Sequence, residues 1–303
     1  MNRREFIISV GAAGMFSLLP SIRLHASAPP KQVAAGEVGL KGPFDIAFDP
    51  SGNILVTDPP GYRVVCLDSS HREVASFGRP GAQKGCLNFP KGLAVDRGSL
   101  IYVVDSNNCR IQVFDRKGTV QRVIGSIGSI GGSFATPQGV FVDSTGRVLV
   151  ADTRNHRIQI FQGDNPIAIL GDLGDGDDQF RLPTACAVTA EGEILALDSK
   201  HGRIKVFGAD LKFIRSFGDV GKEPGRLNMP QGMALDVAGR VWVADTGNHR
   251  IQEFSLDGKV LSVIGKEGSA EGEFKSPTGI ACRKDKIYVA DNGNGRIQVL
   301  ARK

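Results

Sequence analysis

A motif of 46 or 47 residues recurs six times along this 303-residue chain, and this recurrence constrains the fold more than any other feature. The most similar segments are VTDPPGYRVVCLD, VVDSNNCRIQVFD, VADTRNHRIQIFQ, ALDSKHGRIKVFG, VADTGNHRIQEFS and VADNGNGRIQVLA. An arginine stands five residues after the aspartate of each segment. Prolines keep the same spacing at Pro43, Pro90, Pro137, Pro183, Pro230 and Pro277. A period of this length indicates an array of repeated supersecondary units.

Each copy contains four short apolar runs, which in the third copy are GVFVD, RVLVAD, RIQIFQ and PIAILG. Short runs rich in Val and Ile and bounded by Gly, Asp or Asn predict strands rather than helices. Asp143-Ser144-Thr145-Gly146 predicts a tight hairpin between two of them. Four antiparallel strands per copy are typical of a β-propeller blade, so six copies predict an all-β, six-bladed propeller.

The repeats resemble the NHL repeat family, which is named for an Asn-His-Leu signature. The Asn-His pair stands here as Asn155-His156 and Asn248-His249, each followed by Arg-Ile-Gln. The other copies have Gly61-Tyr62, Asn108-Cys109, His201-Gly202 and Asn294-Gly295 at this place. The resemblance covers residues 31–303 and implies the same six-bladed propeller.

The last copy stops after its third strand, at Gln298-Val299-Leu300. The segment KQVAAGEVGLKGP near the start resembles the end of a blade. We therefore expect Gln32 to Gly36 to pair as the outer strand of the last blade, which closes the ring and covers a sheet edge. Deleting residues 29–36 is then expected to cost more stability than trimming an ordinary terminus.

Residues 1–28 form a segment separate from the repeats. Arg3 and Arg4 precede a moderately apolar run that ends at Pro20, and Ala26-Ser27-Ala28 provides a small-residue cleavage site. The run is too short to span a bilayer, which needs ~20 apolar residues. The paired arginines resemble a bacterial twin-arginine export signal, with an ordinary secretory signal as the alternative. We expect a signal at 1–28, cleaved or kept as an anchor, a propeller at 29–303, and a periplasmic or extracellular location.

Charge and composition exclude a simple nucleic-acid-binding role. The whole chain has a formal net charge of +5. Without Arg3, Arg4, Arg23 and Glu5 it carries 34 basic and 31 acidic side chains, a net charge of +3. One Trp and three Tyr offer few platforms for stacking bases. We expect no nucleic-acid partner, no transmembrane segment after removal of the signal, and a monomer.

The recurring aspartates and arginines are interpreted as structural pairs, because six copies of one chemistry indicate architecture whereas catalysis needs a single site. Each aspartate is expected to accept backbone N–H groups of the loop that follows it and to pair with the arginine. The pairs are Asp58 and Arg63, Asp105 and Arg110, Asp152 and Arg157, Asp198 and Arg203, Asp245 and Arg250, and Asp291 and Arg296.

Function is expected where the copies differ, at the mouth of the central channel. The residues directly after the six prolines are Phe44, Lys91, Gln138, Thr184, Gln231 and Thr278. The next residue is glycine in copies 2, 3, 5 and 6, Ala185 in copy 4 and Asp45 in copy 1. This polar ring with a single carboxylate is the candidate surface for a ligand or partner. The alternative is that it only holds channel water.

No metal site or other cofactor is predicted, although Ca²⁺ or Zn²⁺ stays open. His156 and His249 occupy one slot two blades apart, roughly 22 Å from each other given the strand spacing, so they cannot share a zinc ion and are expected to bond within loops. Asp172, Asp175, Asp177 and Asp178 crowd one link and could hold Ca²⁺, but a solvated acidic turn is the preferred interpretation.

The chain has five cysteines and no C-x-x-C motif, which excludes a zinc ribbon or a haem attachment of that kind. Cys66, Cys186 and Cys282 lie in apolar runs and are expected in the core. Cys86 and Cys109 fall on the loop face of the second blade, where a disulfide in an exported protein is a hypothesis.

Two functions remain open. The first is a non-catalytic scaffold whose loop face and channel mouth bind a protein, a peptide or a cell-envelope polymer. The second is a propeller enzyme resembling the peptidyl-glycine amidating lyases or lactonases, with a metal in the channel. The innermost strands lack histidines, and Asp45 is the one carboxylate near the mouth, so the scaffold is preferred.

Overall fold

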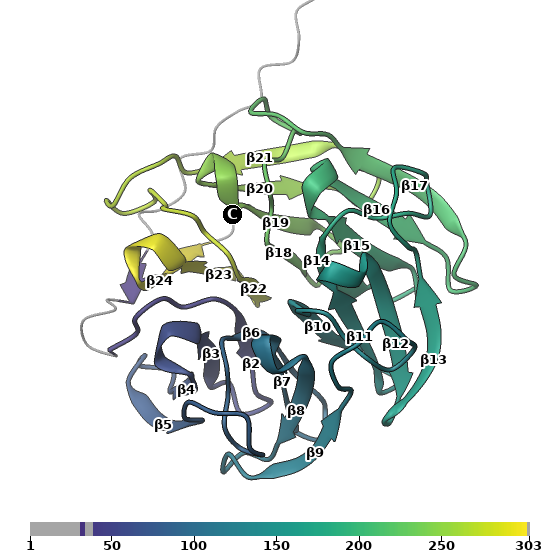
Figure 1. The fold of residues 1–303 in the computed structure, drawn as a ribbon. Helices are drawn as coiled ribbons and strands as arrows, with labels where there is room; N and C mark the ends of the chain where they lie inside the picture. Colours follow the sequence, from purple (N-terminus) through teal and green to yellow (C-terminus); the bar gives the residue numbers. More distant parts are fainter. Residues whose placement is uncertain (1–30, 34–38, 302–303) are drawn as a thin grey trace, which may run out of the picture.

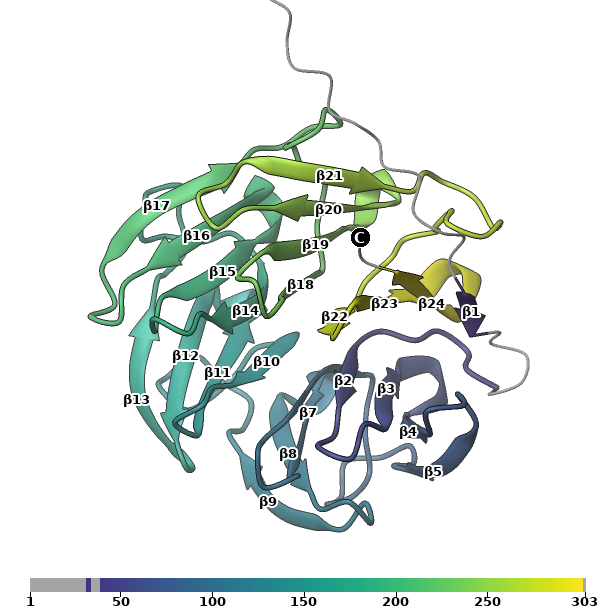
Figure 2. The same cartoon turned by 180° about the vertical axis from the view of Figure 1, so that it is seen from behind.

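The computed structural model describes residues 31–33 and 39–301. Six four-stranded antiparallel sheets surround a central axis as the blades of a ring (Figure 1; Figure 2). This arrangement confirms the all-β, six-bladed propeller predicted from the repeats. The signal expected at 1–28 lies outside the described residues.

Blades 1 to 5 each use four consecutive strands joined by hairpins, and the chain runs through each of them from the inside of the ring outward (Figure 1). Blade 1 consists of β2 (Ile46–Phe48), β3 (Ile54–Asp58), β4 (Arg63–Leu67) and β5 (Glu73–Phe77). Blade 2 consists of β6 (Pro90–Val95), β7 (Ile101–Asp105), β8 (Arg110–Phe114) and β9 (Val120–Ile124). Blade 3 consists of β10 (Gly139–Val142), β11 (Arg147–Asp152), β12 (Arg157–Gln162) and β13 (Asn165–Leu170). Blades 4 and 5 are β14 (Pro183–Val188), β15 (Ile194–Asp198), β16 (Arg203–Phe207) and β17 (Phe213–Gly218); and β18 (Gly232–Leu235), β19 (Val241–Asp245), β20 (Arg250–Phe254) and β21 (Val260–Ile264).

Blade 6 joins the two ends of the chain. It consists of β22 (Ile280–Arg283), β23 (Lys286–Asp291) and β24 (Arg296–Ala301), with β1 (Lys31–Val33) as its outermost strand. Gln32 lies opposite Gln298 in an antiparallel register. The predicted ring closure is therefore confirmed, and the described part of the strand, Lys31–Val33, includes one residue before the predicted start at Gln32. Residues 34–36 lie outside the described residues.

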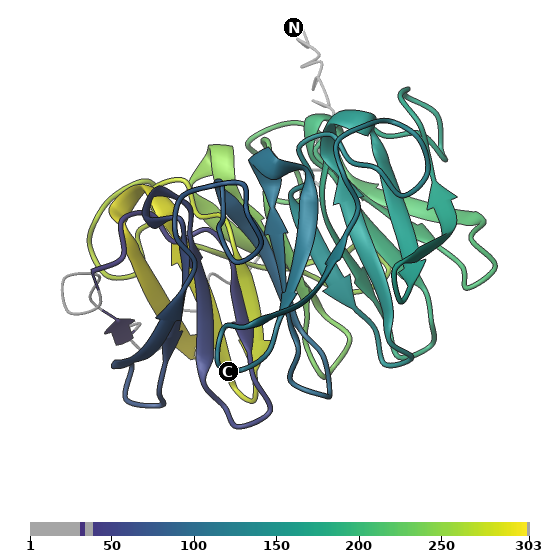
Figure 3. The same cartoon turned by 60° about the horizontal axis from the view of Figure 1, so that its bottom comes forward.

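A single turn of 3-10 helix follows the second strand of every blade, directly after the recurring aspartate. These turns are η1 (Pro59–Gly61), η2 (Ser106–Asn108), η3 (Thr153–Asn155), η4 (Ser199–His201), η5 (Thr246–Asn248) and η6 (Asn292–Asn294). They gather on one face of the ring, the loop face, while the hairpins between the first and second strands lie on the other (Figure 3). The recurring prolines stand at or just before the start of the innermost strands. Pro90 and Pro183 lie opposite Asp105 and Asp198, at the loop-face end of the second strands, so the predicted mouth ring belongs to the loop face.

The core lies in the seams between blades, because alternate residues of a strand point to opposite faces of its sheet. On β19, Val241 and Val243 pack towards blade 4, whereas Trp242 and Ala244 pack towards blade 6. Each seam holds one such apolar cluster among the described residues. No described helix has the length and apolar character required to cross a membrane.

Candidate functional site

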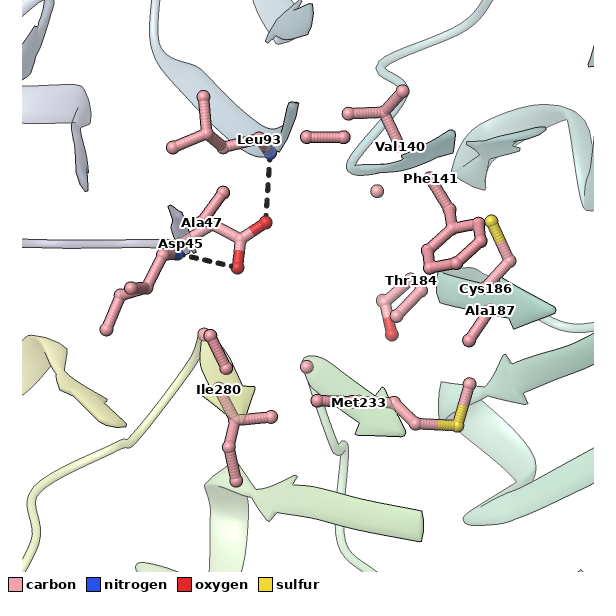
Figure 4. A pocket seen from close by; sticks show the side chains of 18 of the residues that line it. Asp45, Ala47, Leu93, Val140, Phe141, Thr184, Cys186, Ala187, Met233 and Ile280 are labelled. Carbon is pink, nitrogen blue, oxygen red and sulfur yellow. Dashed lines mark hydrogen bonds between the residues drawn. The ribbon is translucent and has the colours of Figure 1, made fainter. Parts of the chain in front are cut away.

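A cavity of about 470 Å³ lies at the centre of the ring, and all six blades contribute to its wall (Figure 4). Each blade contributes its innermost strand and the residues that lead into it. The end near the loop face is polar, with Asp45, Gln138, Thr184, Gln231 and Thr278. The remaining wall is made of apolar residues, glycine and the thiols Cys186 and Cys282. The channel is therefore amphipathic along its length.

The structure places six of the seven predicted mouth residues along this cavity: Phe44, Asp45, Gln138, Thr184, Gln231 and Thr278. Lys91 does not line it. Its ammonium nitrogen lies over the ring of Phe44, 5.2 Å from the centroid, and 5.9 Å from the ring centroid of Phe89. Burial, followed by the charge of Arg154, lowers the pKa of Lys91 to about 8. Lys91 thus forms a cation–π cluster at the rim.

Two of the mouth residues fasten neighbouring blades together. The hydroxyl of Thr184 donates to the carbonyl oxygen of Pro230 in blade 5, at 3.1 Å, and is buried. The hydroxyl of Thr278 donates to the carbonyl oxygen of Phe44 in blade 1, at 2.7 Å. Their hydroxyl protons are therefore engaged by backbone. Gln138 differs, because its side-chain oxygen is buried without a hydrogen-bond partner among the described residues.

Asp45 stands where blades 2, 3, 5 and 6 have glycine and blade 4 has Ala185. A β-carbon on Gly139 would lie only 2.4 Å from the carbonyl oxygen of Thr184 in the next blade, so this close approach requires glycine. Asp45 instead places its carboxylate in the seam between blades 1 and 2. Its Oδ1 accepts the N–H of Ile46 and its Oδ2 accepts the N–H of Leu93, both at 2.9 Å (Figure 4).

The sequence interpretation missed Thr57, which supports this arrangement. Its buried hydroxyl accepts the N–H of Asp45 at 2.9 Å and donates to the carbonyl oxygen of Lys91 at 2.6 Å. The signal was available, because the equivalent residues of the other blades are apolar: Val104, Ala151, Leu197, Ala244 and Ala290. A polar seam between blades 1 and 2 therefore replaces the close glycine contact.

Asp45 is half-buried and lines the channel. Burial raises the pKa of Asp45 to about 7, although the N–H groups of Leu93 and Ile46 oppose this rise. Across residues 39–301 the structure contains no ion pair between Asp45 and a basic side chain. The channel thus contains one carboxylate that lacks a counter-ion.

The recurring aspartates form buried polar boxes with their arginines. The Arg Nε to Asp Oδ2 distances are 3.4, 2.7, 2.8, 3.1, 2.7 and 2.7 Å from blade 1 to blade 6. The expected acceptance of loop N–H groups is wrong. Instead Asp152 Oδ1 accepts the N–H of Ala135, in the link before the blade, and Oδ2 accepts from the amide of Asn155. The third strand bonds to the same link, because Arg157 donates to the carbonyl oxygens of Ile130 and Ser133.

Sequence reasoning also missed the glutamine of the recurring Arg-Ile-Gln. In blade 3 the amide of Gln159 donates to Ser133 O and to Asp152, and its oxygen accepts the N–H of Gly132. Gln112, Gln252 and Gln298 make the equivalent bonds. The recurrence of this glutamine in four copies was the signal. It completes the box as both donor and acceptor.

His156 and His249 connect blades through hydrogen bonds, in agreement with their predicted loop role. Nδ1 of His156 accepts the N–H of Leu182 at 3.1 Å, and Nδ1 of His249 accepts that of Ser276 at 2.9 Å. Leu182 and Ser276 precede prolines and have positive φ values of 55° and 47°. Such strained residues persist where their surroundings hold them. Each histidine therefore holds the strained link of the next blade in place.

The acidic link of blade 4 is held by basic side chains. The four carboxylates are exposed. Asp175 accepts from Arg181 at 2.8 Å and contacts His201 Nε2 at 2.9 Å. Across the described residues no three His, Cys, Asp or Glu side chains gather as a metal-ligand set. A histidine-held zinc, as in amidating lyases, therefore does not fit this channel.

None of the five cysteines, all of which lie within residues 39–301, forms a disulfide in the structure. The hypothesis of a bridge between Cys86 and Cys109 is wrong here, because the two sulfur atoms have different neighbours. Sγ of Cys86 contacts Nε of Arg79 at 3.3 Å, and Sγ of Cys109 accepts the N–H of Thr136 at 3.5 Å. Cys86 and Cys186 are buried, while Cys66 and Cys282 are half-buried. The core placement expected for Cys186 is therefore seen, whereas Cys282 only borders the core.

Comparison with protein families identifies NHL repeats at residues 87–114, 134–161, 227–254 and 274–300. These segments fall in blades 2, 3, 5 and 6. Blades 1 and 4, which lack the glutamine of the polar box, are not among the matched segments. The molecule is thus a six-bladed β-propeller in which four blades match the NHL repeat. A comparison with curated proteins gives no match.

Solved structures with the same fold include enzymes and a binding protein. A streptogramin B lyase has a TM-score of 0.63 at 15% identity, with 88% of this chain and 95% of the lyase covered. A gluconolactonase from Xanthomonas campestris has a TM-score of 0.66 at 13% identity, with 91% and 95% covered. An auxiliary nutrient binding protein from Bacteroides thetaiotaomicron has a TM-score of 0.67 at 12% identity, with 86% and 69% covered. At these identities the likeness shows the fold alone.

Proposed function

We propose that this protein is an exported, non-catalytic scaffold that binds a protein, a peptide or a cell-envelope polymer through its loop face and channel mouth. The observation that carries the proposal is the group of anchors at the rim. Phe89 and Met229 are 40% and 38% exposed, and both are held at positive φ before a proline. Lys91 lies beside Phe89, and Gln231 stands two residues after Met229. Exposed aromatic and Met side chains on a rigid backbone are typical of binding surfaces.

Photocrosslinking from the two faces tests this proposal. A photoreactive phenylalanine analogue replaces Phe89 on the loop face or, as the matched control, Val237, which is 92% exposed on the opposite hairpin face. The purified protein is irradiated with an envelope fraction. We expect a discrete crosslinked product from position 89 that weakens in Lys91→Gln and is absent from position 237. Equal products from both positions, or none from position 89, would contradict the proposal.

A propeller enzyme is the second candidate, and the raised pKa of Asp45 favours it. A carboxyl that titrates near pH 7 in a channel is suited to general acid–base chemistry. A streptogramin B lyase and a gluconolactonase share this fold, which supports this candidate. Measuring the metal content of dialysed protein separates the candidates, because a stoichiometric ion would favour a metal-dependent enzyme over the scaffold.

Export is proposed on the signal segment alone. We infer that residues 1–28 direct a twin-arginine route to the periplasm or beyond, and that the mature propeller is a monomer. Replacing Arg3 and Arg4 with lysine is expected to retain the protein in the cytoplasm. Unchanged export in that variant would indicate the ordinary secretory route, and size-exclusion chromatography tests the monomer.

A further inference from the structure

We propose that the central channel binds a small protonated amine with an aromatic or hydrocarbon body, whose ammonium group pairs with the carboxylate of Asp45. This inference rests on the proposed binding role of the mouth, to which Asp45 belongs. It adds the chemical class of the ligand and places it inside the ring.

The anchor is the fixed carboxylate of Asp45. Each of its oxygens accepts one backbone N–H, from Ile46 or from Leu93, at 2.9 Å. A carboxylate has about four lone-pair sites, so acceptor capacity remains for a donor in the channel. A charged N–H donor gives a stronger hydrogen bond than a neutral one. Because two strands hold the carboxylate, little side-chain entropy is lost when a ligand binds.

The wall below Asp45 suits an apolar body. Phe141, Val142, Val188 and Leu235 line the cavity and are half-buried, so part of each side chain faces the channel. A volume of about 470 Å³ lies within the range of small-molecule sites. Burial of the apolar part of a ligand against these residues would contribute roughly in proportion to the area removed from water.

The charge of the wall selects a cation over an anion. The cavity is lined by no Lys, Arg or His among the residues that the structure describes. Lys91, at the rim, is directed over Phe44 and Phe89. A half-buried carboxylate that lacks a counter-ion is costly even when backbone N–H groups bond it, and an incoming ammonium supplies the missing positive charge. An anion would instead face Asp45 with no compensating charge.

The other ionisable groups near Asp45 leave this charge uncompensated. The strands packed around it carry Asp58 on β3, Lys91 on β6, Cys282 and Arg283 on β22, and Lys286, Tyr288 and Asp291 on β23; across the channel β14 carries Cys186. Lys286 is exposed, Tyr288 packs against Phe48, and Asp291 pairs with Arg296. Asp58 pairs with Arg63, and the guanidinium of Arg283 lies 5.1 Å from the ring centroid of Phe48. Burial raises the pKa of Cys186 to about 12, so its thiol stays neutral. Asp45 is therefore the group that sets the pH dependence of binding.

Three probes of one shape test the inference on the purified full propeller: phenethylammonium, phenethyl alcohol and hydrocinnamate. Titration calorimetry at pH 8 is expected to show phenethylammonium binding at least about tenfold more tightly than the alcohol, and hydrocinnamate binding most weakly. Between pH 6 and pH 8 the affinity for the cation should rise about tenfold, because the carboxyl ionises across this range while the amine stays protonated. The affinity for the alcohol should stay constant.

Asp45→Asn supplies the variant test, with Asp143→Asn as the matched control on the hairpin face of blade 3. Asp45→Asn keeps an acceptor of nearly the same shape, and it should bind cation and alcohol equally at every pH. The control should behave as wild type. Absence of cation binding, a cation that binds no more tightly than the alcohol, or a preference that survives Asp45→Asn would overturn the inference.

Two features keep the test decisive. The pH profile of the wild-type protein requires no variant, so it remains informative if Asp45→Asn fails to fold. If the channel binds no ammonium ion but crosslinking from position 89 persists, the proposed channel ligand is wrong and the proposed scaffold function still holds. If position 89 gives no crosslink but the channel binds the cation, the proposed scaffold function is wrong and the proposed ligand-binding channel still holds.

Discussion

Blades 3 and 4 build the same buried box from different side chains. In blade 3, the amides of Asn155 and Gln159 donate to Asp152 at 2.8 and 3.0 Å. In blade 4, His201 takes the place of the asparagine and Lys205 that of the glutamine. Nδ1 of His201 contacts Asp198 at 2.8 Å, and the ammonium of Lys205 lies 4.0 Å from the same carboxylate.

The two boxes differ in their links as well. Lys205 is fully buried, and its ammonium donates to the carbonyl oxygens of Gly176, Asp177 and Gln179. A lysine cannot accept an N–H as Gln159 does, and it brings a positive charge into the box. The carboxylates of Asp177 and Asp178 oppose the fall in its pKa that burial causes. The acidic link is thus the electrostatic counterpart of a lysine that lies about thirty residues later in the chain.

The largest expected effect comes from removing the central carboxylate of each box. Asp152→Ala leaves a buried arginine and two amides without their acceptor, so we expect about 3–5 kcal/mol less stability. Asp198→Ala should cost more, because it exposes Arg203 and Lys205 to each other without a counter-charge. Denaturant unfolding of both variants measures the difference. Equal losses would mean that the extra charge of blade 4 is balanced by the link alone.

Replacing Lys205 is expected to have the next largest effect. Lys205→Met leaves three carbonyl oxygens unpaired and should cost about 2–4 kcal/mol. Lys205→Gln, the residue of four other blades, should cost less because it donates again. Burial lowers the pKa of Lys205 to about 8, below its value in an unfolded chain, so wild-type stability should rise relative to Lys205→Gln between pH 8 and about 10.4. An unchanged difference across that range would show that Lys205 keeps its ordinary pKa.

The histidine of blade 3 provides a smaller test, since blade 4 has Gly202 at this place. His156→Gly removes the acceptor for the N–H of Leu182, and we expect a loss of about 1 kcal/mol. In blade 4, adding a side chain by Gly202→Ala should destabilise the protein through a clash, because a β-carbon there would lie 2.7 Å from the carbonyl oxygen of Leu227. A neutral result for either variant would show that the link adapts without this contact.

The pH dependence of that contact has a definite sign. Burial, with the charge of Arg181, lowers the pKa of His156 below its ordinary value of 6.5. The neutral imidazole that accepts from Leu182 is therefore favoured in the folded state. Its stabilisation is complete above pH 6.5 and is lost as the pH falls through the folded pKa. His156→Gly should lack this acid-dependent part of the stability, which acid unfolding of both proteins measures.

The sequence predicted the features that repeat. The spacing of the aspartates and prolines predicted the blades, and the incomplete last copy predicted the closure. The positions after the prolines predicted residues that line the channel, except for Lys91. The sequence analysis missed features that depend on how closely two neighbouring blades approach each other. Gly139 and Asp45 occupy equivalent positions in two blades. The structure alone shows that a carbonyl oxygen of the next blade lies close to Gly139, whereas the carboxylate of Asp45 accepts an N–H of the next blade.

Side-chain direction was the second limit. Thr184 and Thr278 were predicted as binding residues from their place in the ring, yet their hydroxyls donate to backbone of the next blade. The pattern of residue types could not distinguish a threonine facing the channel from one facing a seam, because either rotamer fits a strand. Lys205 shows the same limit. Nothing in the repeat pattern indicates that its ammonium bonds to the acidic link of blade 4.

The smallest expected effect belongs to the exposed end of the blade 4 box. Asp175 accepts from Arg181 and contacts His201, but its side chain is 73% exposed, so water replaces these contacts readily. Asp175→Asn should leave the midpoint of denaturant unfolding within experimental error of wild type, whereas Asp198→Ala in the same box shifts it strongly. High salt should not change this ranking. A large shift from Asp175→Asn would mean that the acidic link, rather than Asp198, holds blade 4 together, and the two boxes would then differ in mechanism as well as in composition.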